Sequence, residues 1–109
     1  MEDMNVTYGF QSTMTAAPGR GDELVQLVLS GLAEGNPAAS EHCLVYLVCR
    51  SATDPDVVHL TEGWTSEEDH HRLFAGEAAQ AMVARFDGLL AAEATYSDLT
   101  PVDGKVVAR

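Results

Sequence analysis

The stretch from Thr61 to His71 contains the side chains best suited to chemistry. It holds Trp64, the only tryptophan, and two of the four histidines of the chain. Residues 57–64 are β-branched at the start and aromatic at the end, which is typical of a strand. Because side chains along a strand alternate between its two faces, Glu62 shares a face with Trp64 and with Leu60.

Glu62 is the first candidate for an acid or base. If its face borders an interior cavity, burial disfavours the charged carboxylate and raises the pKa of Glu62. A carboxylate with a raised pKa can act as a general base. The structural alternative is that Glu62 reaches the rim of a subunit interface or pairs with an arginine. A single tryptophan at a strand end is likewise more often part of a core than of a pocket.

His70 is the second candidate, and it lies in the segment after this strand. Ser66 is suited to cap a helix there, and the three acidic residues that follow complement the helix dipole. His70 precedes Phe74 by four residues, so both lie on the inward face of that helix. His70 is therefore predicted as a base or hydrogen-bond donor near Trp64. The alternative is a half-buried histidine with a backbone partner, whereas His71 points about 100° away toward solvent.

The remaining pattern predicts the elements that must position these side chains. Strands are predicted at 6–15, 43–49, 57–64 and 94–102, and helices at 23–33 and 67–92, the second with an optional break near Gly76. Asp22 is predicted to cap the first helix, and the second is predicted to bury one face consisting of Phe74, Ala78, Ala81, Met82, Phe86 and Leu89. The order β-α-β-β-α-β predicts an α+β, ferredoxin-like fold with a four-stranded antiparallel sheet.

The segment Cys43–Cys49 is apolar at every position. A strand with one wet face would alternate, so both faces of this strand are predicted to be buried. Two helices cover one face of the sheet, and a second copy of the chain is the simplest cover for the other, which predicts a homodimer. The two cysteines lie about 20 Å apart in an extended strand, too far for a disulfide. They are predicted to be buried and reduced, and no metal site is predicted.

Length and charge restrict the classes of partner. The 109 residues predict one domain spanning 1–109, with a core at about 5–102 and a polar tail at 103–109. Seventeen acidic residues against six basic ones give a net charge of −11, which disfavours nucleic acid and anionic membranes as partners. No apolar stretch is long enough to span a bilayer, and Met1–Asn5 lacks the organisation of a signal peptide, so a cytoplasmic location is expected.

Three motifs give the chain a family resemblance. They are residues 15–24 (TAAPGRGDEL), residues 50–56 (RSATDPD) and residues 61–68 (TEGWTSEE) with His70 after them. Together they resemble the antibiotic biosynthesis monooxygenase superfamily of dimeric α+β barrels. The resemblance covers about residues 5–100 and is more specific for the fold than for the reaction.

The resemblance implies a small oxygenase that uses O₂ without a bound metal or organic cofactor. Such enzymes oxidise polycyclic phenols, anthrones or quinols to quinones, and their tryptophan points into the barrel cavity. By this comparison His70 and Glu62 are the candidate catalytic residues, and Trp64, Leu60 and Phe74 are the candidate substrate contacts.

The chain departs from the pattern of the family it resembles at three of these positions. Leu60 stands where aromatic-polyketide oxygenases resembling this chain carry an asparagine, and His70 stands where they tend to carry a tyrosine. Haem-degrading relatives have a histidine at the position of Phe74, so haem degradation is not predicted. Two alternatives to a monooxygenase remain open. One is a non-enzymatic dimeric barrel that binds a small aromatic or apolar ligand, and the other is a cyclase or isomerase that uses the same cavity without O₂.

Overall fold

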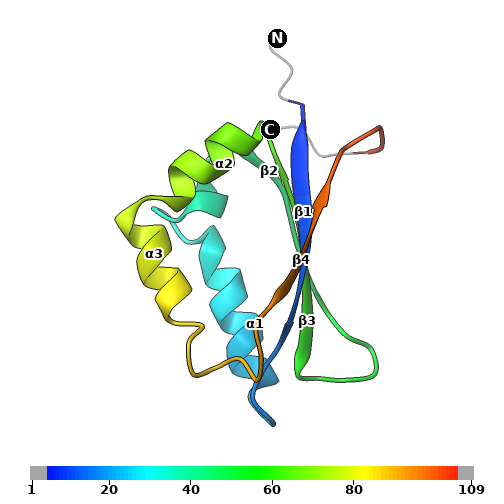
Figure 1. The fold of residues 1–109 in the computed structure, drawn as a ribbon, viewed down its shortest axis with the longest axis vertical. Helices are drawn as coiled ribbons and strands as arrows, with labels where there is room; N and C mark the ends of the chain where they lie inside the picture. Colours follow the sequence, from blue (N-terminus) through cyan, green and yellow to red (C-terminus); the bar gives the residue numbers. More distant parts are fainter. Residues whose placement is uncertain (1–4, 106–109) are drawn as a thin grey trace.

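The computed structural model describes residues 5–105 and contains four strands, three α-helices and two short 3-10 helices. Their order along the chain is shown in Figure 1. The elements are β1 (Tyr8–Thr15), α1 (Gly21–Leu29), η1 (Ser30–Leu32), η2 (Pro37–Ala39), β2 (Cys43–Arg50), β3 (Val57–Trp64), α2 (Glu67–Phe74), α3 (Glu77–Ala84) and β4 (Thr95–Leu99).

The strands form one antiparallel sheet in the order β2-β3-β1-β4. This is the predicted ferredoxin-like arrangement, and its α+β class is confirmed. In the register, Phe10 of β1 lies opposite Glu62 of β3 on one side and opposite Asp98 of β4 on the other. Leu60 and Tyr96 flank Ser12 in the same way. Because paired residues in a sheet point to the same face, all six side chains share one face.

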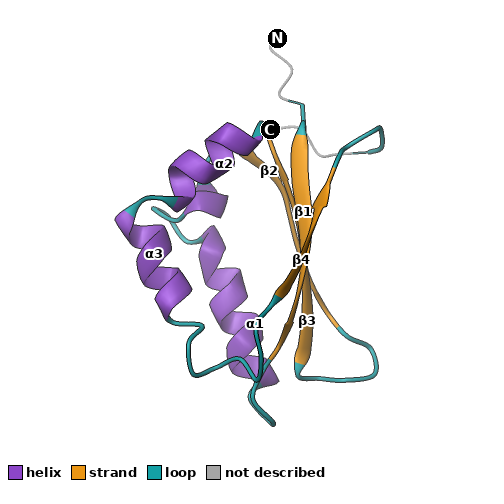
Figure 2. Ribbon diagram, viewed as in Figure 1, coloured by secondary structure: helices purple, strands orange, loops and turns teal. Residues whose placement is uncertain are grey.

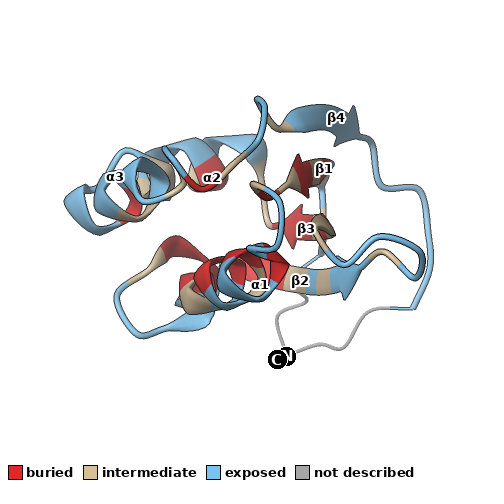
Figure 3. Cartoon of the chain, turned by 90° about the horizontal axis from the view of Figure 1, so that it is seen from below, coloured by how far each residue is buried: buried red, intermediate tan, exposed pale blue. Residues whose placement is uncertain are grey.

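The helices cover that face and leave the other face of the sheet without a covering layer (Figures 1 and 2). Leu24 and Val28 of α1 pack against Val58 of β3, and all three are almost completely buried. The burial is strongest in β1, β3 and α1, whereas β4 is exposed at all of its positions (Figure 3). The core therefore lies between α1 and the middle of the sheet.

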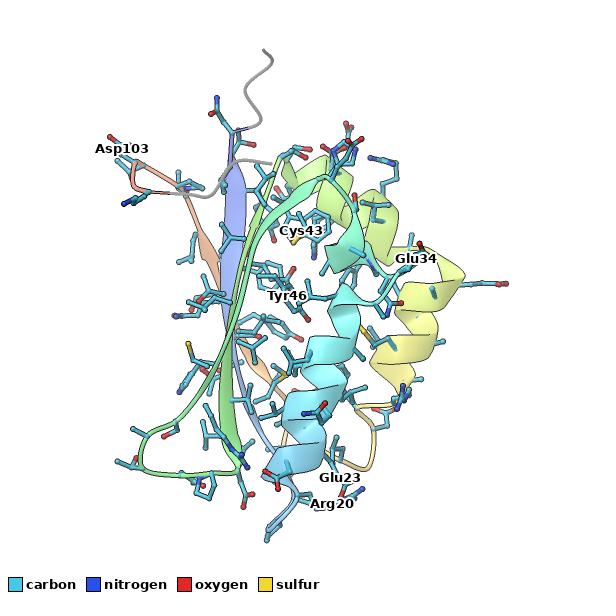
Figure 4. All side chains as sticks on the ribbon, turned by 180° about the vertical axis from the view of Figure 1, so that it is seen from behind. Arg20, Glu23, Glu34, Cys43, Tyr46 and Asp103 are labelled. Atoms are coloured by element: carbon cyan, nitrogen blue, oxygen red, sulfur yellow. The ribbon has the colours of Figure 1, made fainter. Side chains whose placement is uncertain are left out.

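β2 is an edge strand, and within this chain only its inward side is covered. Burial of its outward side by a second copy stays a prediction. Tyr46 and Val48 pack on the core, and Figure 4 shows Tyr46 between the sheet and α1. Leu47 on the opposite side is 56% exposed, and Cys49 is exposed as well. Cys43 is buried as predicted, but burial of Cys49 is not supplied by this chain. The two cysteines do not form a disulfide.

The start of α1 is capped from a distant loop rather than by Asp22. The Asp56 carboxylate accepts hydrogen bonds from the backbone N–H groups of Gly19 and Gly21, both at 3.0 Å. Arg50 donates to the Pro55 carbonyl and to Asp22. A Cβ on Gly21 would collide with the Pro55 carbonyl, so only glycine permits this close approach. The β2–β3 loop is thus fastened to the helix start.

The second helical region has the break allowed for near Gly76 and ends earlier than predicted. It breaks at residues 75–76, where Gly76 becomes the N-cap of α3, and α3 ends at Ala84 rather than near 92. The break shifts the helix phase, so Ala79 is buried while Ala78 and Ala81 are exposed. Helix α1 also starts and ends earlier than predicted, at Gly21 and Leu29, and β4 is shorter, since it ends at Leu99.

The predicted extent of the domain stays a prediction, since Met1–Met4 and residues 106–109 lie outside the described residues. Within residues 5–105, no helix is long and apolar enough to cross a membrane.

Candidate functional site

A cavity of about 870 Å³ lies between the covered face of the sheet and α2, α3 and the segment that follows α3. All four strands contribute to its lining, as do both ends of the 86–94 segment. Most of the wall is apolar, with Phe10, Leu60 and Phe74 among its residues. The volume suits an aromatic small molecule, since ligand sites typically measure about 300–1,000 Å³.

Glu62 presents a buried carboxylate to this cavity. The residue is 5% exposed, and its Oε1 accepts a 2.7 Å hydrogen bond from Nε1 of Trp64. Burial raises the pKa of Glu62 to about 7, and the Trp64 hydrogen bond opposes this by stabilising the charged form. The period of the strand correctly predicted that Glu62 and Trp64 share one face. Within residues 5–105, the hydrogen-bond partner of Glu62 is Trp64 rather than an arginine.

Trp64 differs from the prediction in its contacts. Its side chain is completely buried, packs with Ala38 and Cys43, and is not among the residues that line the cavity. Trp64 therefore donates a hydrogen bond to the Glu62 carboxylate, and its ring does not form part of the cavity surface. Leu60 and Phe74, the other predicted substrate contacts, do line the cavity.

His70 lies in the same cavity wall among aromatic rings. It is 9% exposed, stacks on Phe74 with a centroid separation of 4.8 Å, and meets Trp64 edge-on at 5.0 Å. Phe10 and Tyr8 lie at 5.1 and 5.6 Å. Among the described residues, neither ring nitrogen has a hydrogen-bond partner.

The surroundings of His70 keep its imidazole neutral. Burial is the largest cause, and repulsion from His71 adds to it, so that the pKa of His70 falls to about 4. A neutral imidazole has one N–H donor and one acceptor nitrogen. A buried pair of unsatisfied polar atoms is costly, and a ligand in the cavity can satisfy them.

Local structure explains why His70, and not His71, faces inward. Ser66 caps α2 as predicted, with its Oγ accepting from the Asp69 N–H at 3.0 Å. This fixes the start of the helix and hence the direction of each later side chain. The His71 side chain is 63% exposed and lies 3.8 Å from Glu67, in agreement with the prediction.

The other two histidines lie outside the cavity lining. His59 contacts the Thr13 hydroxyl at 3.0 Å, and His42 contacts the Thr65 hydroxyl at 3.2 Å.

Several lining residues were not predicted as part of a site. The Tyr8 hydroxyl donates to the Asp98 carboxylate at 3.2 Å, and burial is the largest cause that raises the pKa of Tyr8 to about 12. Tyr96 lies two residues before Asp98 on the same face. Tyr8 and Phe10 share a face because side chains alternate along β1, but the pairing of β1 with β4, which brings Asp98 beside them, is a long-range feature.

The sequence profile of the antibiotic biosynthesis monooxygenase (ABM) family matches residues 8–85, from β1 through α3. The chain belongs to the ABM family. Proteins of this family are typically monooxygenase-like and are commonly dimeric.

Solved structures agree with this ABM fold. A proposed antibiotic biosynthesis monooxygenase from Chloroflexus aurantiacus is 30% identical, with 91% of this chain and 96% of that chain covered and a TM-score of 0.77. A protein of unknown function from Nitrosomonas europaea is 16% identical, with 98% and 100% covered and a TM-score of 0.79. A proposed antibiotic biosynthesis monooxygenase from Caulobacter crescentus is 20% identical, with 92% and 93% covered and a TM-score of 0.74. The last two similarities concern the fold alone. No curated protein matches the chain.

Proposed function

We propose that this ABM family protein is a cofactor-independent monooxygenase that oxidises a polycyclic phenol, anthrone or quinol with O₂ to a quinone. One observation carries the proposal. The buried Glu62 carboxylate, with its pKa near 7, and the neutral, unpartnered His70 imidazole border the same apolar cavity. Above pH 7, Glu62 is ionised and His70 is uncharged, which is the pairing of a base with a neutral hydrogen-bond donor.

Glu62 takes the proton in the first step. A base with a pKa near the working pH combines a useful ionised fraction with a useful driving force. The proton comes from the substrate O–H or from an acidic C–H, and the negative charge moves onto the substrate oxygen. The His70 N–H donates to that oxygen and stabilises the charge as it develops.

The substrate anion then supplies the electrons for oxygen. With an anthrone, the carbanion transfers an electron to O₂, the two radicals join in a C–O bond, and the resulting peroxide loses water. One oxygen atom becomes the new carbonyl, and the other leaves as water with both hydrogens of the methylene carbon. A phenol is oxygenated at a ring C–H in the same way. A quinol instead transfers two electrons and two protons to O₂, which gives a quinone and hydrogen peroxide without insertion of an oxygen atom.

Oxygen uptake with a panel of anthrones, naphthols and hydroquinones tests the proposal. His70→Phe keeps an aromatic ring in the cage and Glu62→Gln keeps an acceptor for Trp64, so both variants remove the chemistry while retaining the packing. Each should lower turnover by about 10²–10⁴. His71→Phe is the matched control and should retain full activity. Substrate conversion without oxygen consumption would favour the cyclase or isomerase, and binding without conversion would favour the ligand-binding module.

We also propose that the chain forms a homodimer through the uncovered face of the sheet. Val45 and Leu47 of β2 point to that face, and the outward position of Leu47 is 56% exposed. Replacing both with Glu should dissociate the dimer, whereas replacing Leu44, which is buried, and Val48, which packs on the core, should unfold the chain. Sedimentation at micromolar concentration distinguishes these results. A well-folded monomer of the unmodified protein would overturn the proposal.

A further inference from the structure

The charged side chains that line the cavity are all acidic. They are Glu62, Asp87, Glu93 and Asp98, and no lysine or arginine lines the cavity among residues 5–105. The arginines with known partners are engaged elsewhere: Arg20 with Glu23, Arg50 with Asp22 and Arg72 with Asp69 (Figure 4 labels the first pair at the start of α1). A bound anion would find no counter-charge in this wall.

His70 does not supply one. Its two ring nitrogens are buried and have no hydrogen-bond partner among the described residues, in a residue that is 9% exposed. A ligand hydroxyl can form hydrogen bonds with these nitrogens, because a neutral imidazole has one donor and one acceptor. The imidazole adds no positive charge to the cavity in doing so. The unpartnered His70 nitrogens favour a ligand with a hydroxyl group, and the acidic wall favours a ligand that is neutral or positively charged.

One acid has surroundings suited to a cation. Asp98 on β4 accepts the Tyr8 hydroxyl at 3.2 Å, and Tyr96 lies on the same face of that strand. The Phe10 ring is 6.1 Å from the rings of both Tyr8 and Tyr96. A carboxylate flanked by aromatic rings matches an ammonium group, which gains from the charge and from the ring faces.

The register gives the distance from this acid to the base. Glu62 and Asp98 are both paired with Phe10, one on each side of it, so they lie two strand spacings apart. Two spacings amount to about 10 Å between their backbones. A fused aromatic skeleton with a short amine arm can span that separation, with its hydroxyl near Glu62 and His70 and its amine near Asp98.

We propose that the substrate of this cavity is a hydroxylated polycyclic aromatic compound bearing a protonated amine, and that Asp98 with Tyr8 and Tyr96 forms the ammonium subsite. The inference rests on the proposed function only in taking the cavity as the substrate site. The selectivity it describes is a property of binding and does not require turnover.

Calorimetry with three matched naphthols tests it. The probes carry an aminomethyl, a hydroxymethyl or a carboxylate group at one and the same ring position. The aminomethyl naphthol should bind about tenfold more tightly than the hydroxymethyl one, and the carboxylate about tenfold more weakly, because charges in contact near a protein surface still interact by more than a tenfold change requires, even at an exposed acid such as Asp98. The preference should shrink with added salt.

Asp98→Asn removes the charge but keeps an oxygen that can accept the Tyr8 hydroxyl. It should reduce the preference for the amine over the alcohol to less than about threefold. Asp103→Asn, which makes the same change at an exposed residue beyond β4 that does not line the cavity, should keep the full preference.

Equal binding of the amine and the carboxylate, an undiminished preference in Asp98→Asn, or no binding of any probe would overturn the inference. Its failure is separable from failure of the oxygenase proposal. Selective binding without oxygen uptake would overturn only the proposed reaction, and oxygen uptake with equal preference for all charges would overturn only the ammonium subsite.

Discussion

The two candidate catalytic residues should affect folding stability with opposite dependence on pH. The pKa of Glu62 rises from 4.5 in the unfolded chain to about 7 in the folded protein. Between these values the folded protein holds a proton that the unfolded chain has lost. Stability therefore falls as pH rises, by up to about 1.4 kcal/mol per pH unit and roughly 3 kcal/mol in total. The loss is complete above about pH 7.

His70 has the reverse effect, because its pKa falls from 6.5 to about 4 on folding. Between these values the unfolded chain holds a proton that the folded protein lacks. Stability is therefore lost as pH falls from 6.5 toward 4, with a similar slope. From about pH 4.5 to 6.5 the contributions of Glu62 and His70 to the pH dependence of stability nearly cancel. Each contribution can be measured only when the other residue is replaced.

Urea unfolding from pH 4.5 to 8, followed by the fluorescence of the only tryptophan, measures both effects. Relative to the unmodified protein, Glu62→Gln should gain stability steadily from pH 4.5 to 7, while His70→Phe should gain it steadily from pH 6.5 down to 4.5. A constant offset from altered packing does not matter, because the slope is the readout. Protein concentration must be held fixed so that any subunit association contributes equally.

Glu68→Gln and His71→Phe control for loss of a carboxylate and an imidazole on the exposed side of α2. If the Glu62→Gln curve ran parallel to that of the unmodified protein from pH 4.5 to 7, Glu62 would ionise equally well in both states. That result would remove the base from the proposed mechanism.

Three further predictions concern individual contacts. Trp64→Phe removes the only donor to Glu62 seen among the described residues. Because that hydrogen bond favours the charged carboxylate, its loss should raise the pKa of Glu62 by roughly one to two pH units. The acidic limb of the pH profile of turnover should shift to higher pH by the same amount. Asp56→Ala removes both hydrogen bonds at the start of α1 and should lower the free energy of unfolding by about 1–2 kcal/mol, with an unchanged urea result showing that the cap contributes nothing. Gly31→Ala would place a Cβ 2.5 Å from the Tyr46 hydroxyl oxygen and should cost about 1–3 kcal/mol in the same assay; a neutral outcome would mean that Tyr46 moves freely.

The features that the sequence predicted well are local. The strand at 57–64 agrees with the structure at both ends, because a turn precedes it and the Ser66 cap follows it. The period of that strand placed Glu62 beside Trp64, and the spacing of α2 placed His70 beside Phe74. These side chains meet because two short, well-delimited elements adjoin in the chain.

The features that were missed depend on distant contacts or on a change of helix phase. Asp56 caps α1 from 35 residues away, and no local pattern identifies it as the partner of Gly21. Trp64 turns away from the cavity because η2 and the start of β2 pack around its ring. The break at Gly76 restarts the helix, so a single period extended across it assigns the wrong alanines to the interior.

Because of the break at Gly76, two separate parts of the chain form the cavity wall. Glu62 and His70 belong to β3 and α2, which adjoin through the Ser66 cap, whereas much of the opposite wall comes from α3 and residues 86–94. Substitutions in the latter can alter the size and shape of the chamber while the acid–base pair keeps its support. This division makes the scaffold suitable for directed evolution, with a library confined to residues 82–94 and the reactive pair left intact. It also gives a physical route by which one reaction can be adapted to many substrates within a chain of about a hundred residues.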